Sequence, residues 1–162
     1  MKTILTIITL TILGAINAQE KLDINDFKDV LGVEWKGKLT YKNYSDGRMV
    51  NIDCTLRLEK DTDASVKYIQ KYPYEPKANS SGKWKLQKDG TFFNKGVVIS
   101  KKYAEDGSLE FTTRSTGKDN GKPSTFYMTY RIGKDSLSYK KEVKYDGTED
   151  RFVRNKYEYA RN

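Results

Sequence analysis

The strongest constraint on this chain is an alternation of apolar and polar residues that begins at Val33 and recurs to the C-terminal end. The clearest case is a segment in which polar residues separate Val50, Ile52, Cys54, Leu56 and Leu58. A period of two gives each strand one buried face and one solvated face, which is typical of antiparallel sheets. The alternation therefore predicts an all-β chain.

Short turns separate the alternating segments. Turn signals rich in Gly and Asp lie at residues 45–47, 88–90, 133–135 and 146–147. The strands expected between such turns cover residues 33–42, 50–59, 65–72, 84–86, 92–100, 109–113, 125–132, 137–145 and 152–161. In residues 92–100 the alternation does not show which side chains point inward. Residues 73–82 and 117–124 have the composition of loops. Hairpin links throughout favour an antiparallel up-and-down β-barrel of about eight to nine strands, because closure removes exposed sheet edges.

One short helix is expected before the first strand. In residues 21–31, Ile24, Phe27, Val30 and Leu31 fall on one face at helical spacing. Asp23 or Asn25 can cap its start and Gly32 can end it. A helix this short is not stable alone. We therefore expect it to dock on an apolar part of the barrel.

The first eighteen residues have the pattern of a secretory signal peptide. Lys2 supplies a positive start, an apolar run covers residues 4–16, and Ala15 and Ala18 give the small-x-small cleavage pattern. The alternative is a transmembrane anchor, but the run is short for a bilayer span of about 20 residues. We expect residues 1–18 to be removed, leaving 19–162 as a single exported domain, periplasmic or secreted, monomeric and without a membrane span.

The absence of His and the single Cys restrict the catalysis, the metal binding and the disulfide formation that are open to this chain. The chain has no His, which excludes Ser-His-Asp and Cys-His catalysis, His-ligated haem and most zinc sites. It has one Cys, so no internal disulfide can form. Cys54 shares its phase with the apolar residues of its segment, and we expect it to be buried and inert. The sequence thus predicts neither a metal nor a cofactor.

The stretch Gly32-Val33-Glu34-Trp35, placed after a short helix and before a meander that ends in a basic strand, resembles the lipocalins and the wider calycin barrels. Two residues separate the Gly from the Trp here, and one does in lipocalins. The resemblance implies a barrel whose Trp35 lies at the closed end. It also implies a basic residue of the last strand, Arg154 or Arg161, stacked on that tryptophan.

Tyrosines are the main candidates for lining a ligand cavity. The chain has 12 Tyr, and those at inward phase are Tyr41, Tyr68, Tyr130, Tyr139 and Tyr157. Each offers a ring for packing and a hydroxyl for a ligand. The alternative is ordinary core filling, because a small barrel either is filled by side chains or holds one small ligand.

Lys141 is the most unusual residue of the inward set. It is in phase with Tyr139 and Val143, which points its ammonium into the barrel. A buried ammonium must be paired or lose its proton. One interpretation is an anchor for an acidic ligand head group. The other is a β-bulge that turns Lys141 outward, or a position near the wet rim.

Other features favour binding over catalysis. Acidic residues that might form a glycosidase-like pair take outward phase, namely Glu34, Asp53, Glu59, Glu110 and Glu142, so we expect no enzyme activity. The lysines mostly alternate outward without interleaved aromatics, which disfavours nucleic acid as a partner. Residues 71–76 contain two Tyr and two Pro and could form either a lid or a plain connection.

Two functional hypotheses remain. The first is a lipocalin-like barrel that binds a small apolar or anionic amphipathic molecule. The alternative is a non-catalytic interaction module with a filled barrel, which presents its basic face or the loop around Tyr74 to a protein or a polyanionic glycan. An internal cavity of several hundred cubic ångströms favours the first hypothesis, and a packed interior favours the second.

Overall fold

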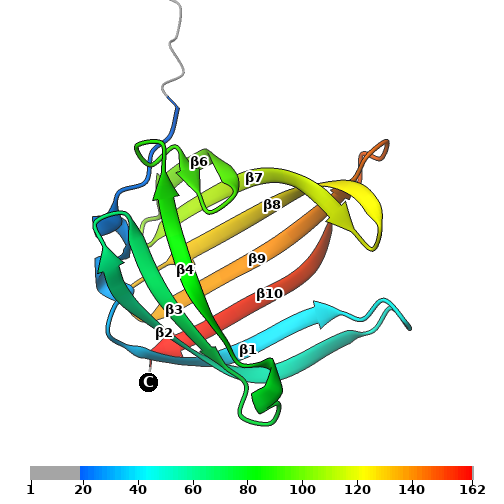
Figure 1. Cartoon of the computed structure of the whole chain (residues 1–162), viewed down its shortest axis with the longest axis horizontal. Coiled ribbons are helices and arrows are strands. Elements are labelled where there is room, and N and C mark those ends of the chain that lie inside the picture. Colours follow the sequence, from blue (N-terminus) through cyan, green and yellow to red (C-terminus); the bar gives the residue numbers. More distant parts are fainter. Residues whose placement is uncertain (1–18, 162) are drawn as a thin grey trace, which may run out of the picture.

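The chain folds into a closed antiparallel barrel of ten strands in the order of the sequence, shown in Figure 1. This computed structural model describes residues 19–161, so the expected signal peptide lies outside the described residues. The strands are β1 (Glu34–Lys42), β2 (Met49–Thr62), β3 (Ser65–Lys71), β4 (Ser80–Gln87), β5 (Phe92–Phe93), β6 (Gly96–Tyr103), β7 (Leu109–Asp119), β8 (Lys122–Ile132), β9 (Ser136–Tyr145) and β10 (Phe152–Arg161). The expected all-β meander is confirmed.

The strand count exceeds the expected eight to nine because one segment is split. Residues 92–100, whose phase is unclear in the sequence, contain β5, a turn at Asn94 and Lys95, and the start of β6. Asn94 takes a positive φ of 54°, a left-handed conformation that Asn tolerates better than most residues. The chain reverses direction there, so the residues that point inward before the turn and after it do not follow one common alternation.

The expected loop at residues 117–124 is instead the end of a long hairpin. β7 continues to Asp119 and β8 begins at Lys122, with Asn120 and Gly121 between them at φ values of 47° and 77°. An Asn-Gly pair with both φ values positive is the preferred two-residue hairpin turn. The segment is polar because the hairpin projects beyond the core, and polarity alone does not indicate a loop.

The N-terminal helix is a 3-10 helix, η1 (Ile24–Val30), and is shorter than the expected 21–31. Asp23 caps it, accepting a hydrogen bond from the Asn25 backbone while Asp26 bonds back to the Asp23 backbone. Because the apolar residues Ile24, Phe27 and Val30 recur every three positions, a helix with three residues per turn places them on one face.

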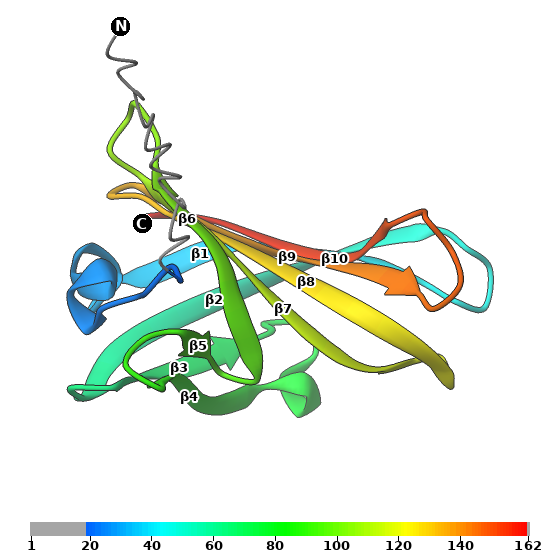
Figure 2. The ribbon, with the colours of Figure 1, turned by 90° about the horizontal axis from the view of Figure 1, so that it is seen from above.

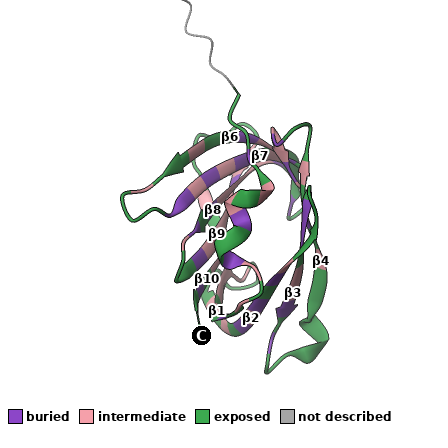
Figure 3. Ribbon diagram, turned by 90° about the vertical axis from the view of Figure 1, so that its left-hand side faces the viewer, coloured by how far each residue is buried: buried purple, intermediate pink, exposed green. Residues whose placement is uncertain are grey.

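η1 lies across one end of the barrel, as Figure 3 shows, and closes it. Phe27 and Val30 are buried, and the indole N–H of Trp35 donates to the Val30 carbonyl at 3.1 Å. The phenyl ring of Phe27 stacks on Phe93 at a centroid distance of 5.5 Å. The main aliphatic core packs against this end, and Cys54 is buried as expected.

In one sector of the barrel wall, neighbouring strands pair over only a few residues. β4 pairs with β5 only at Leu86 and Gln87, and β5 pairs with β6 only through its two residues. Residues 80–84 of β4 are therefore paired along one edge only, with β3, and residues 115–119 of β7 only with β8. Figure 2 shows β4 and β7 diverging on this side, so the barrel has a lateral opening.

A second short 3-10 helix, η2 (Pro76–Ala78), lies in the connection between β3 and β4. Within residues 19–161, no helix has both the length and the apolarity that crossing a membrane would require.

Candidate ligand-binding cavity

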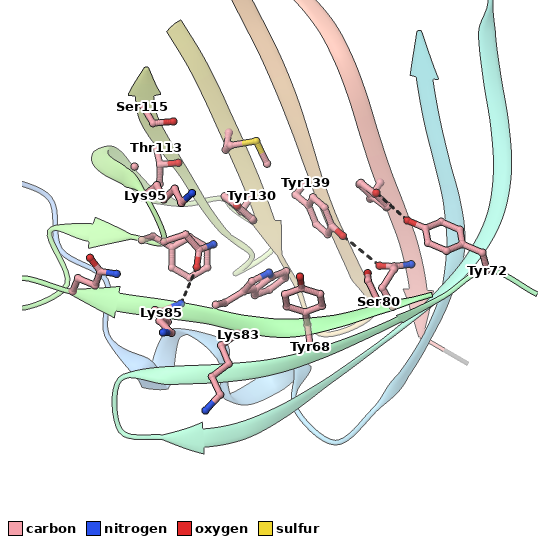
Figure 4. A pocket seen from close by; sticks show the side chains of 18 residues that line it. Tyr68, Tyr72, Ser80, Lys83, Lys85, Lys95, Thr113, Ser115, Tyr130 and Tyr139 are labelled. Carbon is pink, nitrogen blue, oxygen red and sulfur yellow. Dashed lines mark hydrogen bonds between the residues drawn. The ribbon is translucent and has the colours of Figure 1, made fainter. Parts of the chain in front are cut away.

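The lateral opening leads into a cavity of about 640 Å³ inside the barrel. Figure 4 shows side chains from β3, β4, the β5–β6 turn and β7 to β10 around it. Its lining comprises Tyr68, Gln70, Tyr72, Ser80, Lys83, Trp84, Lys85, Gln87, Phe93, Asn94, Lys95, Gly96, Thr113, Ser115, Met128, Tyr130, Tyr139 and Tyr157. The interior is thus hollow on this side and packed beneath η1.

Aromatic rings form most of the inner wall. The indole of Trp84 lies edge-on to Tyr130 and to Tyr139, with both centroid distances at 5.8 Å. Tyr139 in turn stacks on Tyr157 at 4.5 Å. The alternation along β4 turns Trp84 inward and turns both Lys83 and Lys85 to the outer face of the strand, as Figure 4 shows. These contacts fix the rings in both edge-on and stacked orientations.

Deep polar groups of the cavity bond to one another. The Tyr159 hydroxyl donates to Gln70 Oε1 at 2.7 Å, and Gln70 Nε2 donates to the Thr55 carbonyl at 2.9 Å. The hydroxyls of Tyr72 and Tyr157 share a hydrogen bond of 3.1 Å. These bonds hold the side chains in place and leave little free hydrogen-bonding capacity at the inner end.

Burial raises the pKa of Tyr157 and Tyr139 above the ordinary tyrosine value. The same desolvation acts on Tyr130 and Tyr159, whose pKa values are also raised. Removing a phenolate from water is costly, so the neutral form persists. The inner wall is therefore uncharged at physiological pH.

Positive charge collects at the mouth. Lys83, Lys85 and Lys95 are exposed residues of the lining, together with the hydroxyls of Ser80 and Ser115. Lys83 is paired with Asp61 at 2.8 Å. Lys85 is turned to the outer face of β4. Lys95 lies in the β5–β6 turn and forms no ion pair with any residue in 19–161, so its charge is available to a ligand. The cavity is apolar within and cationic at its entrance.

Four of the tyrosines predicted as ligand-binding residues border this cavity: Tyr68, Tyr130, Tyr139 and Tyr157. Tyr41 and Lys141 do not. They border a second hollow of about 410 Å³ with Leu39, Asp119, Arg154 and Asn155. Lys141 is the next inward residue after Tyr139 on β9, so the second hollow lies one step further along the strand from the first.

Lys141 points inward, because the β8–β9 ladder runs through it without a shift and pairs it with Met128. The suggested bulge lies instead in β10, between Val153 and Asn155. The ammonium of Lys141 lies 3.8 Å from the Phe126 ring centroid, and no carboxylate within 19–161 forms an ion pair with it. Partial burial lowers its pKa.

The basic residue expected over Trp35 is not found in that position. Arg154 lies in the β10 bulge at the far end of the strand, where it stacks on Tyr44 at 4.0 Å and donates to the Lys42 carbonyl. Arg161 does pair with Trp35 in the β1–β10 register, but its guanidinium is directed to the Lys134 carbonyl at 3.2 Å. Within 19–161 no cation stacks on the indole, which bonds to η1 instead.

Sequence reasoning missed Trp84, Gln70 and Lys95. The alternation of β4 does indicate that Trp84 is buried, but it carries no sign of a cavity. The role of Lys95 depends on the short β5, which opens the wall beside it. That opening comes from strand pairing distant in sequence, so no local pattern predicts it.

No family model and no curated protein sequence matches this chain. Among solved structures, the chain is similar to Rv2717c from M. tuberculosis, with 14% sequence identity and a TM-score of 0.56. The similarity covers 86% of this chain and 96% of the other. At this level of identity the likeness extends to the barrel fold alone.

Proposed function

We propose that this protein is an exported, lipocalin-like binding protein that holds a small apolar or anionic amphipathic molecule in its barrel. The observation that carries the proposal is the cavity of about 640 Å³ with an aromatic wall and the unpaired Lys95 at its mouth. Its volume falls in the range of roughly 300–1,000 Å³ typical of small-molecule sites. A ligand would bury its apolar part against the rings and leave a polar group near the entrance.

The proposal leaves two positions for an acidic group. Lys95 borders the cavity itself. Lys141 borders the adjacent hollow, beyond Met128, and is the position expected from the alternation. An acidic group would form a stronger ion pair with Lys141 than with a fully exposed lysine, because this ammonium is half-buried and water screens its charge less.

The exposure of Tyr74 supports the alternative function, an interaction module. This side chain is 82% exposed in the β3–β4 connection, next to Pro73. Its neighbour Tyr72 is buried and borders the cavity. A protein or a polyanionic glycan would then bind the outside of the barrel, and occupancy of the cavity would not matter.

The proposal is tested by native mass spectrometry of the protein purified from its own host, followed by extraction of any bound molecule. Met128→Trp should block the cavity, and Tyr127→Trp on the outer face is the matched control. We expect a bound small molecule that Met128→Trp loses and Tyr127→Trp keeps, while circular dichroism stays unchanged in both.

Two further results decide between the hypotheses. If Lys141→Met alone releases an acidic ligand, the head group lies in the second hollow. If the protein is empty and binds none of decanoate, decanol and the aromatic acid 2-naphthoate, the carrier function is wrong. Binding of a polyanionic glycan that is unaffected by Met128→Trp would then favour the interaction module.

A further inference from the structure

The cavity wall contains far more rings than aliphatic side chains. Seven aromatic residues line it, and Met128 is the one aliphatic side chain in its described lining. The aliphatic residues of the barrel lie elsewhere, in the packed core: Leu56, Leu58, Val66, Val98, Leu109 and Leu137. The segregation means that a ligand in this cavity meets ring faces and ring edges almost exclusively.

Building on the proposed function, we propose that the ligand is a planar aromatic acid, with its rings among the cavity side chains and its acidic group at Lys95. Burial of apolar area stabilises an alkyl chain and a fused ring to a similar degree. Ring–ring contacts in stacked or edge-on geometry add a further contribution that an alkyl chain does not receive.

The orientation of the wall suits such contacts. Trp84 presents its indole at 73° to Tyr130 and at 90° to Tyr139, while Tyr139 and Tyr157 are stacked at 27°. A rigid planar ligand also loses less conformational freedom on binding than a flexible chain does. Both effects favour fused rings over an aliphatic tail of equal size.

The same wall disfavours a sugar acid. Sugars need many unpaired hydrogen-bonding groups, but several polar atoms at the inner end are already paired with one another. Gln70 accepts from Tyr159 and donates to the Thr55 carbonyl. The hydroxyls of Tyr72 and Tyr157 are bonded to each other. A sugar in this position would leave several of its hydroxyls without partners, which is costly.

The positive charge at the cavity entrance indicates that the ligand carries a negative charge. Lys83 is neutralised by Asp61 and points away from the cavity in Figure 4. Lys85 points away from the cavity in the same view, whereas Lys95 lies beside Thr113 on the cavity wall and has no ion-pair partner within 19–161. An acidic group at the edge of a ring system would meet the ammonium group of Lys95.

The test compares 2-naphthoate with decanoate, which carries the same charge on a chain, by isothermal titration calorimetry of the purified protein. We expect 2-naphthoate to bind roughly tenfold more tightly, as one or two ring–ring contacts would give. The neutral 2-naphthol and the sugar acid galacturonate complete the panel, and both should bind more weakly than 2-naphthoate.

A matched pair of variants isolates the ring. Tyr157→Phe and Tyr157→Leu both lose the hydroxyl bonded to Tyr72, and only Tyr157→Leu loses the ring. We expect Tyr157→Phe to keep the preference for 2-naphthoate and Tyr157→Leu to reduce it. Trp35→Phe makes Trp84 the sole tryptophan, so its fluorescence reports both occupancy and an intact cavity in each variant.

A charge control completes the design. Lys95→Met should weaken binding of 2-naphthoate and leave 2-naphthol unchanged, while Lys77→Met, an exposed lysine outside the lining, should change neither. If decanoate or galacturonate binds at least as tightly as 2-naphthoate, the aromatic class is wrong and the carrier function stands. If no member of the panel binds, both proposals fail.

Discussion

Trp35 shows how a single residue fixes the closed end of the barrel. Its side chain is fully buried, and its one polar atom is satisfied by the Val30 carbonyl. The hydrogen bond ties the first strand to η1, so the same residue contributes both apolar burial and orientation. A buried indole N–H without a partner would be costly.

Trp35→Ala should lower the free energy of unfolding by about 3–5 kcal/mol, because it removes a large buried ring and leaves a void beneath η1. Urea denaturation followed by circular dichroism measures the loss. Trp35→Phe, which keeps a ring and gives up the hydrogen bond, should cost less. A loss below about 1 kcal/mol for Trp35→Ala, the size of an ordinary substitution, would mean that the side chain is not a core residue.

At the scale of elements, η1 depends on contacts with a distant strand. Asp26 accepts hydrogen bonds from the Lys101 ammonium at 2.8 Å and from the Tyr103 hydroxyl at 3.0 Å, both on β6. Burial alone would lower the pKa of Lys101, but the bond and charge of Asp26 outweigh it, and the pKa is raised. The ion pair holds a helix that is too short to be stable by itself.

Asp26→Asn should destabilise the protein by about 1–3 kcal/mol, because it leaves the partly buried Lys101 without its counter-charge. Asp29→Asn is the control on the same helix, since Asp29 is exposed, and should change stability by less than about 0.5 kcal/mol. Chemical denaturation of both variants measures the difference. Equal effects of the two changes would show that the ion pair does not hold η1.

At the scale of the whole molecule, the barrel is packed at one end and hollow beside its lateral opening. The hollow is surrounded by tyrosines, and burial raises the pKa of five tyrosines in and beneath its wall: Tyr72, Tyr130, Tyr139, Tyr157 and Tyr159. In the folded state these hydroxyls keep their protons above pH about 10, where an unfolded tyrosine loses its own. The stability they contribute is therefore complete below pH about 10 and is lost as pH rises further.

Alkaline titration followed by tyrosinate absorbance tests this expectation. In the native protein these five tyrosines should titrate only as the barrel unfolds, so their absorbance should rise together with the loss of circular dichroism. In urea all 12 tyrosines should titrate as one population near pH 10. A native protein that titrates every tyrosine near pH 10 with its fold intact would contradict the buried arrangement.

The sequence by itself determined the fold class, because a period of two and hairpin turns are local properties that survive into the folded state. The alternation placed Tyr68, Tyr130, Tyr139 and Tyr157 on the inner face, and all four border the cavity. It also placed Cys54 in the core. In each case the phase of a strand is fixed by its own residues and by the need to bury one face.

Tertiary structure decided which inward residues share a cavity. Phase assigns a side chain to the inner face but not to a position around the barrel, so Lys141 and Tyr41 could not be separated from the tyrosines of the main cavity by pattern. The entrance with Lys95 exists because the two-residue β5 barely joins β4 to β6. Which strands leave a gap is settled by pairing across the closed barrel, and only the assembled sheet contains that information.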